Sequence, residues 1–187
     1  MRRHLFSLIA GFWCLSYTAN AHVASTGPAV GSTAPDFKAH NVVTRQTIPL
    51  SSQRGRVVIL TFWASWCAPC RRELPILEKA QRLVGKDKLT VFAVSYRETP
   101  QAAASLSKLA STWQINVLDD PDGWIAGHYA ITAIPHLFII GRNGNVLANH
   151  VGYGDRSIDD LVTDINQALS EATPADPEVT PSTTGST

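Results

Sequence analysis

Residues 63–70 read Trp63-Ala64-Ser65-Trp66-Cys67-Ala68-Pro69-Cys70, and they join two segments of different periodicity. Residues 57–64 form an apolar, β-branched run of strand length. Residues 67–83 instead repeat apolar side chains at helical spacing, at Leu74, Leu77, Ala80 and Leu83. The sequence therefore predicts a buried strand that passes directly into a helix, with both cysteines in the first helical turn and Pro75 kinking the helix.

This position favours a reactive sulfur at Cys67. Unpaired backbone N–H groups and the positive end of the helix dipole favour a thiolate, which is the attacking species in disulfide exchange. Pro69 is tolerated in a first helical turn because its missing N–H matters little there. A bridge from Cys67 to Cys70 would constrain the unfolded chain little, so we interpret the pair as reactive. The alternatives are a structural disulfide or half of a zinc site, which typically needs two such pairs.

The N-terminus is typical of an export signal. Arg2 and Arg3 precede a mostly apolar run at 5–17, and Ala19-Asn20-Ala21 is a small-x-small cleavage site. We predict a signal peptide over 1–21 and a periplasmic protein. A retained membrane anchor is the alternative, but the run is shorter than the roughly 20 residues that span a bilayer. Cleavage removes Cys14 and leaves one cysteine pair.

The rest of the chain fits a single domain. With 187 residues and 44% apolar content, one core is expected, and a net charge of +1 gives no reason to expect a nucleic-acid partner. We expect a flexible lead-in at 22–31, a domain at 32–170 and a disordered tail at 171–187. The elements predicted around the motif are a hairpin (37–40 and 46–49), strands at 89–95, 115–118, 137–140 and 146–151, and helices at 101–111, 124–129 and from Ser157 or Asp159 to Ser170.

Three motifs together resemble the thioredoxin superfamily, and within it the exported TlpA/ResA-like thiol–disulfide oxidoreductases. They are the stretch 62–70, Pro75 inside the following helix, and Ala133-Ile134-Pro135 before a strand, a glycine turn and a second strand. The resemblance covers about residues 32–170. It implies an α/β thioredoxin-like fold, with a central mixed sheet flanked by helices and an N-terminal hairpin extension. The start at 31–37 also resembles peroxiredoxins, but the Pro-x-x-x-Thr-x-x-Cys setting of their cysteine is absent.

The resemblance also assigns residues to the site, with two departures from the family pattern. Thr61 stands where thioredoxin has a buried Asp, so the role of proton acceptor for Cys70 falls to Glu98, just after the second parallel strand. The alternative for Glu98 is a solvated loop acid. Pro135 is expected in cis beside the cysteines, unless it is an ordinary strand-edge proline. It is followed by His136, where Thr is common.

The expected reaction is disulfide exchange, in which Cys67 attacks and Cys70 resolves the mixed disulfide. Trp66, Ile134, Pro135 and His136 would form the substrate surface. By resemblance the protein is a reductant of periplasmic protein disulfides, such as those of apocytochrome c or copper-site proteins. It would act as a monomer without a cofactor or resident metal and be fed by a membrane thiol-reducing electron donor. The alternatives are Cu(I) delivery through Cys67, Cys70 and His136, since sulfur ligands select this soft ion, or oxidation of folding proteins.

Overall fold

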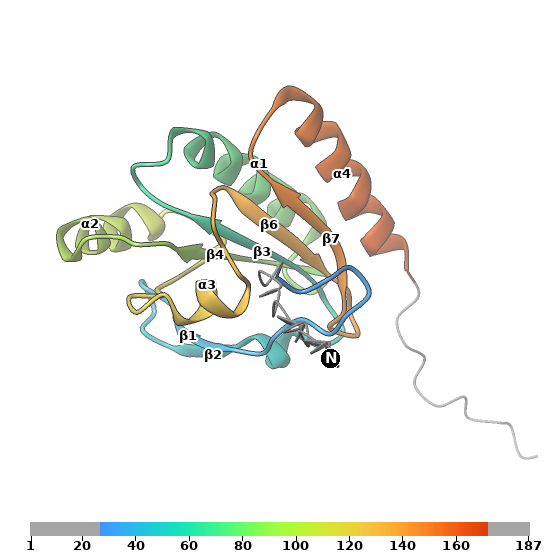
Figure 1. Ribbon diagram of the computed structural model, residues 1–187, viewed down its shortest axis with the longest axis horizontal. Coiled ribbons are helices and arrows are strands. Elements are labelled where there is room, and N and C mark those ends of the chain that lie inside the picture. The colour runs from blue at the N-terminus through green and yellow to red at the C-terminus, as the bar shows by residue number, and fades with distance from the viewer. Residues whose placement is uncertain (1–26, 172–187) are drawn as a thin grey trace, which may run out of the picture.

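The computed structural model describes residues 27–171 (Figure 1). The predicted signal peptide, the first part of the lead-in and the predicted tail beyond Glu171 lie outside these residues. At the described end of the lead-in, the Gly31 amide donates to the Val146 carbonyl. Within residues 27–171, no helix has the length and apolar character needed to cross a membrane.

The centre of the molecule is a mixed five-stranded sheet in the order β5-β4-β3-β6-β7. The strands β3 (Val57–Trp63), β4 (Leu89–Ser95) and β5 (Asn116–Leu118) are parallel. The strands β6 (His136–Ile140) and β7 (Val146–Val151) continue the sheet in antiparallel pairing. This confirms the predicted parallel crossover and the predicted antiparallel pair after the glycine turn.

Helices cover both faces of the sheet (Figure 1). One face packs against α1 (Ala68–Val84), α2 (Pro100–Ala110) and α4 (Asp155–Ser170). The other packs against α3 (Trp124–His128), the hairpin of β1 (Lys38–His40) and β2 (Thr47–Pro49), and the short 3-10 helix η1 (Leu50–Gln53). Every residue of β3 and β4 is therefore buried, as expected for strands covered on both sides.

Most element predictions are confirmed within a residue or two, but the start of α4 is wrong. Thr99 caps α2 as predicted, since its hydroxyl accepts from the amide of Ala102. The helix α4 begins at Asp155, earlier than the predicted caps at Ser157 or Asp159. Several residues in this stretch are able to cap a helix, so the sequence pattern alone does not choose among them.

The buried stripe of α1 also differs from the prediction. Its buried residues are Cys70, Glu73, Leu74, Leu77 and Gln81. Leu83 is instead 76% exposed, because the helical repeat that buries Leu74 and Leu77 brings Gln81 rather than Leu83 to the sheet. The Gln81 Nε2 atom donates to the Gln114 carbonyl at 2.9 Å, and its Oε1 accepts from the Val91 amide at 2.6 Å. This side chain fastens α1 to β4.

Replacing Gln81 by Ala should therefore lower the free energy of unfolding by about 2–4 kcal/mol, because it leaves two backbone groups without their partners. Gln167→Ala is the matched control, since Gln167 lies exposed on α4. Urea unfolding of the oxidised proteins measures both. Equal stability of the two variants would contradict this role for Gln81.

Candidate active site

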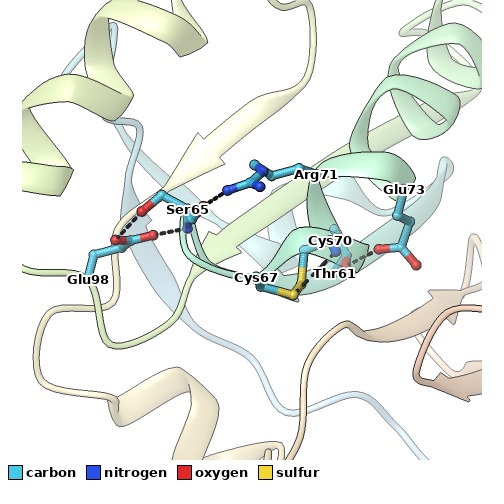
Figure 2. The surroundings of a disulfide bond; sticks show 7 residues. All are labelled: Thr61, Ser65, Cys67, Cys70, Arg71, Glu73 and Glu98. Atoms are coloured by element: carbon cyan, nitrogen blue, oxygen red, sulfur yellow. Dashed lines mark hydrogen bonds between the residues drawn. A yellow bond between two sulfur atoms is a disulfide. The ribbon is translucent and has the colours of Figure 1, made fainter.

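The two cysteines lie at the junction of β3 and α1, joined in a disulfide with a Cα–Cα distance of 5.3 Å (Figure 2). Cys67 is the N-cap of α1, and its backbone is extended, with φ −84° and ψ 100°. Its Sγ accepts a hydrogen bond from the Cys70 amide at 3.2 Å. The sulfur therefore occupies the place that a Ser or Asp oxygen takes in an ordinary N-cap, where negative charge is favoured.

The two sulfurs differ in burial. Cys67 is 5% exposed and Cys70 is 0% exposed, which agrees with the assignment of Cys67 as attacking and Cys70 as resolving residue. Beside them, Trp66 is 60% exposed and available to a partner protein, whereas Trp63 lies in the core against Trp113.

The loop that leads into Cys67 is held from two sides at Ser65 (Figure 2). The Ser65 amide donates to Glu98 Oε1, and its hydroxyl donates to Glu98 Oε2 at 2.9 Å. The Ser65 carbonyl accepts from Arg71 Nη1 at 2.7 Å. Both oxygens of Glu98 are therefore committed to Ser65. This contact favours a role for Glu98 in positioning the loop. Its expected role as proton acceptor for Cys70 stays a prediction.

A different carboxyl group follows the cysteines on α1. Glu73, one turn after Cys70 on α1, is 4% exposed, and its Oε2 accepts from the Thr61 hydroxyl of β3 at 2.9 Å (Figure 2). Burial raises the pKa of Glu73 from 4.5 to about 7, against the opposing effect of the Thr61 hydrogen bond. At neutral pH this carboxyl group is able both to take up and to release a proton.

Sequence reasoning missed Glu73, although a signal for it exists. Helical spacing places Glu73 on the same buried face of α1 as Cys70 and Leu74. A charged residue on an otherwise apolar helix face is seldom fully buried without a partner, and is a candidate for function. Thr61 stands at the position of the buried thioredoxin Asp but supplies no carboxyl group of its own. Its hydroxyl instead donates a hydrogen bond to the carboxyl group of Glu73 on α1.

The predicted cis-proline is confirmed, since the Ile134–Pro135 peptide bond is cis. Pro135 directly precedes β6. Because His136 pairs with Phe62, Pro135 lies at the end of the sheet where β3 leads into the cysteines. The Pro135 carbonyl accepts from the Gly152 amide at 2.8 Å, which ties this loop to the end of β7. Ile134 is half-buried and touches both core clusters.

His136 is not brought to the sulfurs. Its ring stacks on Phe138 at 4.7 Å, in the core of the sheet face opposite the one that contains Cys67 and Cys70. Nε2 bonds to Asn149 Oδ1 at 2.7 Å, and Nδ1 is buried with no hydrogen-bond partner among the described residues. Burial lowers the pKa of His136, against the opposing effect of the Asn149 bond. A neutral ring that is 7% exposed offers little surface to a substrate.

The position of His136 also removes the third ligand of the copper site considered as an alternative. Across residues 27–171 there is no group of three or more His, Cys, Asp or Glu side chains arranged to hold a metal ion. The alternative of Cu(I) delivery through Cys67, Cys70 and His136 therefore has no support from the geometry.

Comparison with solved structures defines the class of the protein. A Chlorobium tepidum protein described as a thiol:disulfide interchange protein DsbE superposes with a TM-score of 0.68 and 32% identity, over 76% of this chain and 99% of that one. The predicted thioredoxin-like fold is thereby confirmed. With its cysteine pair at the start of α1, the protein is a thiol–disulfide oxidoreductase.

The chain belongs to the AhpC/TSA family, which matches residues 30–149. Among curated proteins, it is 33% identical to the thioredoxin-like protein YneN of Bacillus subtilis, over 65% of this chain and 71% of the relative. It is 32% identical to the thiol-disulfide oxidoreductase ResA of Geobacillus kaustophilus, over 76% of this chain and 80% of the relative. The predicted kinship with ResA-like proteins is confirmed.

The raised pKa of Glu73 gives a prediction for stability against pH. The Glu73 carboxyl group keeps its proton up to about pH 7 in the folded state, whereas it releases the proton near pH 4.5 in the unfolded state. The protonated carboxyl group therefore contributes fully to the free energy of unfolding below pH 4.5, and this contribution is lost as pH rises through about 7. It amounts to about 3 kcal/mol at most. In the oxidised Glu73→Gln variant, we expect the free energy of unfolding, measured by urea unfolding, to change less with pH between pH 5 and about 8 than in the wild type. Glu78→Gln, on the same helix, is the control; equal slopes in wild type and Glu73→Gln would contradict this assignment.

Proposed function

We propose that this protein is an exported reductant of disulfides in other proteins. The observation that carries the proposal is the N-terminal cap of α1. There the Cys67 sulfur accepts a hydrogen bond from the Cys70 amide, and the buried Glu73 carboxyl group lies one turn after Cys70. The arrangement supplies an attacking sulfur, a resolving sulfur and an acid–base group within the first two turns of α1. The Ser65 loop, held by Glu98 and Arg71, keeps the attacking sulfur at the helix start.

The exchange uses two successive attacks. The Cys67 thiolate attacks a substrate disulfide, forms a mixed disulfide, and releases the first substrate sulfur as a thiolate. The Cys70 thiol passes its proton to the Glu73 carboxylate, and its thiolate attacks Cys67 Sγ. The second substrate sulfur leaves, Cys67 and Cys70 form a disulfide, and two electrons have passed to the substrate. A dithiol donor in the membrane, working in the reverse direction, returns the pair to its reduced form.

The surface around the cysteines suits an extended segment of a partner protein. Trp66 is exposed on one side, and Ile134 and Pro135 precede β6 on the other. Since proline has no N–H, we infer that the backbone of Ile134 pairs with the substrate chain. The signal-like residues 1–21 support a periplasmic location. The resemblance to TlpA/ResA-like proteins supports apocytochrome c or copper-site proteins as substrates, and action as a monomer.

Substitution of Glu73 and substitution of Glu98 should have different effects on the rate of the resolving step. An aromatic disulfide that releases a coloured thiolate reports the attack of Cys67 as the first release and the attack of Cys70 as the second. Glu73→Gln should slow the second release about 100-fold and remove its rise with pH near 7, because an amide cannot accept the proton. Glu98→Gln should keep the pH profile of that release. The reverse pattern would return the role of proton acceptor to Glu98.

The direction of the reaction and the partner are tested together. We expect a reduction potential near that of thioredoxin, about −270 mV, rather than the about −120 mV of a strong oxidant. The Cys70→Ser variant cannot resolve its mixed disulfide, so it should capture substrate proteins from a periplasmic extract, and Cys67→Ser/Cys70→Ser is the control. A strongly oxidising potential would favour the oxidant of folding proteins instead. Capture that does not depend on Cys67 would contradict both.

A further inference from the structure

A second pair of titratable side chains lies on the same face of the sheet as Glu73. Thr61 of β3 is in register with Leu137 of β6, and Leu137 is in register with His150 of β7. Residues paired across neighbouring strands project to the same face, so these three form one row across the sheet. Glu73 is bonded to the first member of this row. His150, the third member, has no part in the exchange described above.

A small cavity lies beside Glu73 and His150. Its volume is about 10 Å³, and both Glu73 and His150 line it. This is about the smallest space that holds one water molecule, which needs polar partners in the wall. Glu73 and His150 supply such partners on opposite elements, and the remaining walls include the apolar side chains of Ile76, Ile158 and Leu161.

His150 continues toward solvent through α4. Its Nε2 lies 2.8 Å from Asp164 Oδ2, and the side chains of His150 and Asp164 are 18% and 35% exposed. In a neutral ring, Nε2 donates to this carboxylate, so Nδ1 is the nitrogen that is able to accept a proton. Histidine is the side chain that proteins commonly use as a proton shuttle.

Other charged or titratable side chains among the described residues also lie near this path. Tyr153, from the turn before α4, also lines the cavity, and the Arg72 guanidinium of α1 lies 5.4 Å from the centre of its ring. Arg72 is exposed and engaged with this ring. On β3 the facing group is the hydroxyl of Thr61, which does not titrate in this range. Glu73 and His150 both line the cavity, and Asp164 is the partner of His150.

We propose that His150, held by Asp164, is the proton exit of the site, exchanging protons with Glu73 through one water molecule in this cavity. This rests on the proposed function, in which Glu73 receives the proton of Cys70. In this proposal Glu73 releases its proton through His150 of β7 and Asp164 of α4, a route that uses neither cysteine.

The steps balance in protons and move no electrons. The Cys70 thiol gives its proton to the Glu73 carboxylate, and the resulting carboxylic acid gives a proton to the water. The water passes a proton to His150 Nδ1, and the ring becomes an imidazolium paired with the Asp164 carboxylate. The imidazolium then returns a proton to bulk solvent. His150 and Asp164 touch neither substrate nor sulfur in this scheme, so they are positioning and relay residues.

The test measures the two thiolate releases described above in wild type, His150→Gln and Asp164→Asn, in a weak buffer and with added imidazole. His40→Gln is the control, since His40 is exposed on β1 and its Nδ1 lies 2.9 Å from the Thr47 hydroxyl in the hairpin. We expect His150→Gln to slow the second release about tenfold and leave the first unchanged, because only the second needs the relay. Added imidazole should restore the second release in His150→Gln and leave wild type unaffected.

The outcomes separate the relay from the function itself. A second release that is unchanged in His150→Gln, or slowed without any response to imidazole, would overturn the relay and leave the proposed function standing. A wild type that never gives the second release would overturn the function first. Should His150→Gln fail to fold, Asp164→Asn decides, because it keeps the ring but removes its carboxylate partner. A second release with the wild-type pH profile in that variant would overturn the proposal.

Discussion

The structure depends on one hydrogen bond, from the amide of Cys70 to the sulfur of Cys67. It exists because β3 ends as a buried strand and α1 begins immediately behind it, so the sulfur becomes the cap of a 17-residue helix. An ordinary cap would be an oxygen from Ser, Thr, Asp or Asn. Placing a sulfur there turns the usual stabilisation of a helix start into stabilisation of a negative charge on a nucleophile.

Two glutamates support this arrangement in different ways. Glu98, from the loop after β4, accepts twice from Ser65 and so fixes the approach to Cys67, and Arg71 holds the other side of the same residue. Glu73 is on α1 itself and is buried against Thr61. Burial raises the pKa of Glu73 to about 7, which is where a proton acceptor for a thiol is useful.

The fold could be predicted from sequence because its signals are local. The apolar run before Cys67, the helical spacing after it and the glycine turn at 141–144 each determine one element, and the structure places these elements almost as expected. The site was only partly predictable, because its polar contacts join residues distant in the chain. The partner of Glu98 is Ser65 rather than Cys70, and the face on which His136 lies follows from the register of β6 against β3. Neither can be derived from spacing alone.

The most direct test of this account is the rate at which reduced Cys67 is alkylated as a function of pH, in a Cys70→Ser variant. If the helix start holds the sulfur as a stabilised anion, half of the full reactivity should be reached well below the pH of about 8.5 at which an ordinary cysteine thiol ionises. Half-reactivity at or above that pH would show that the cap does not activate the sulfur, and would contradict the account.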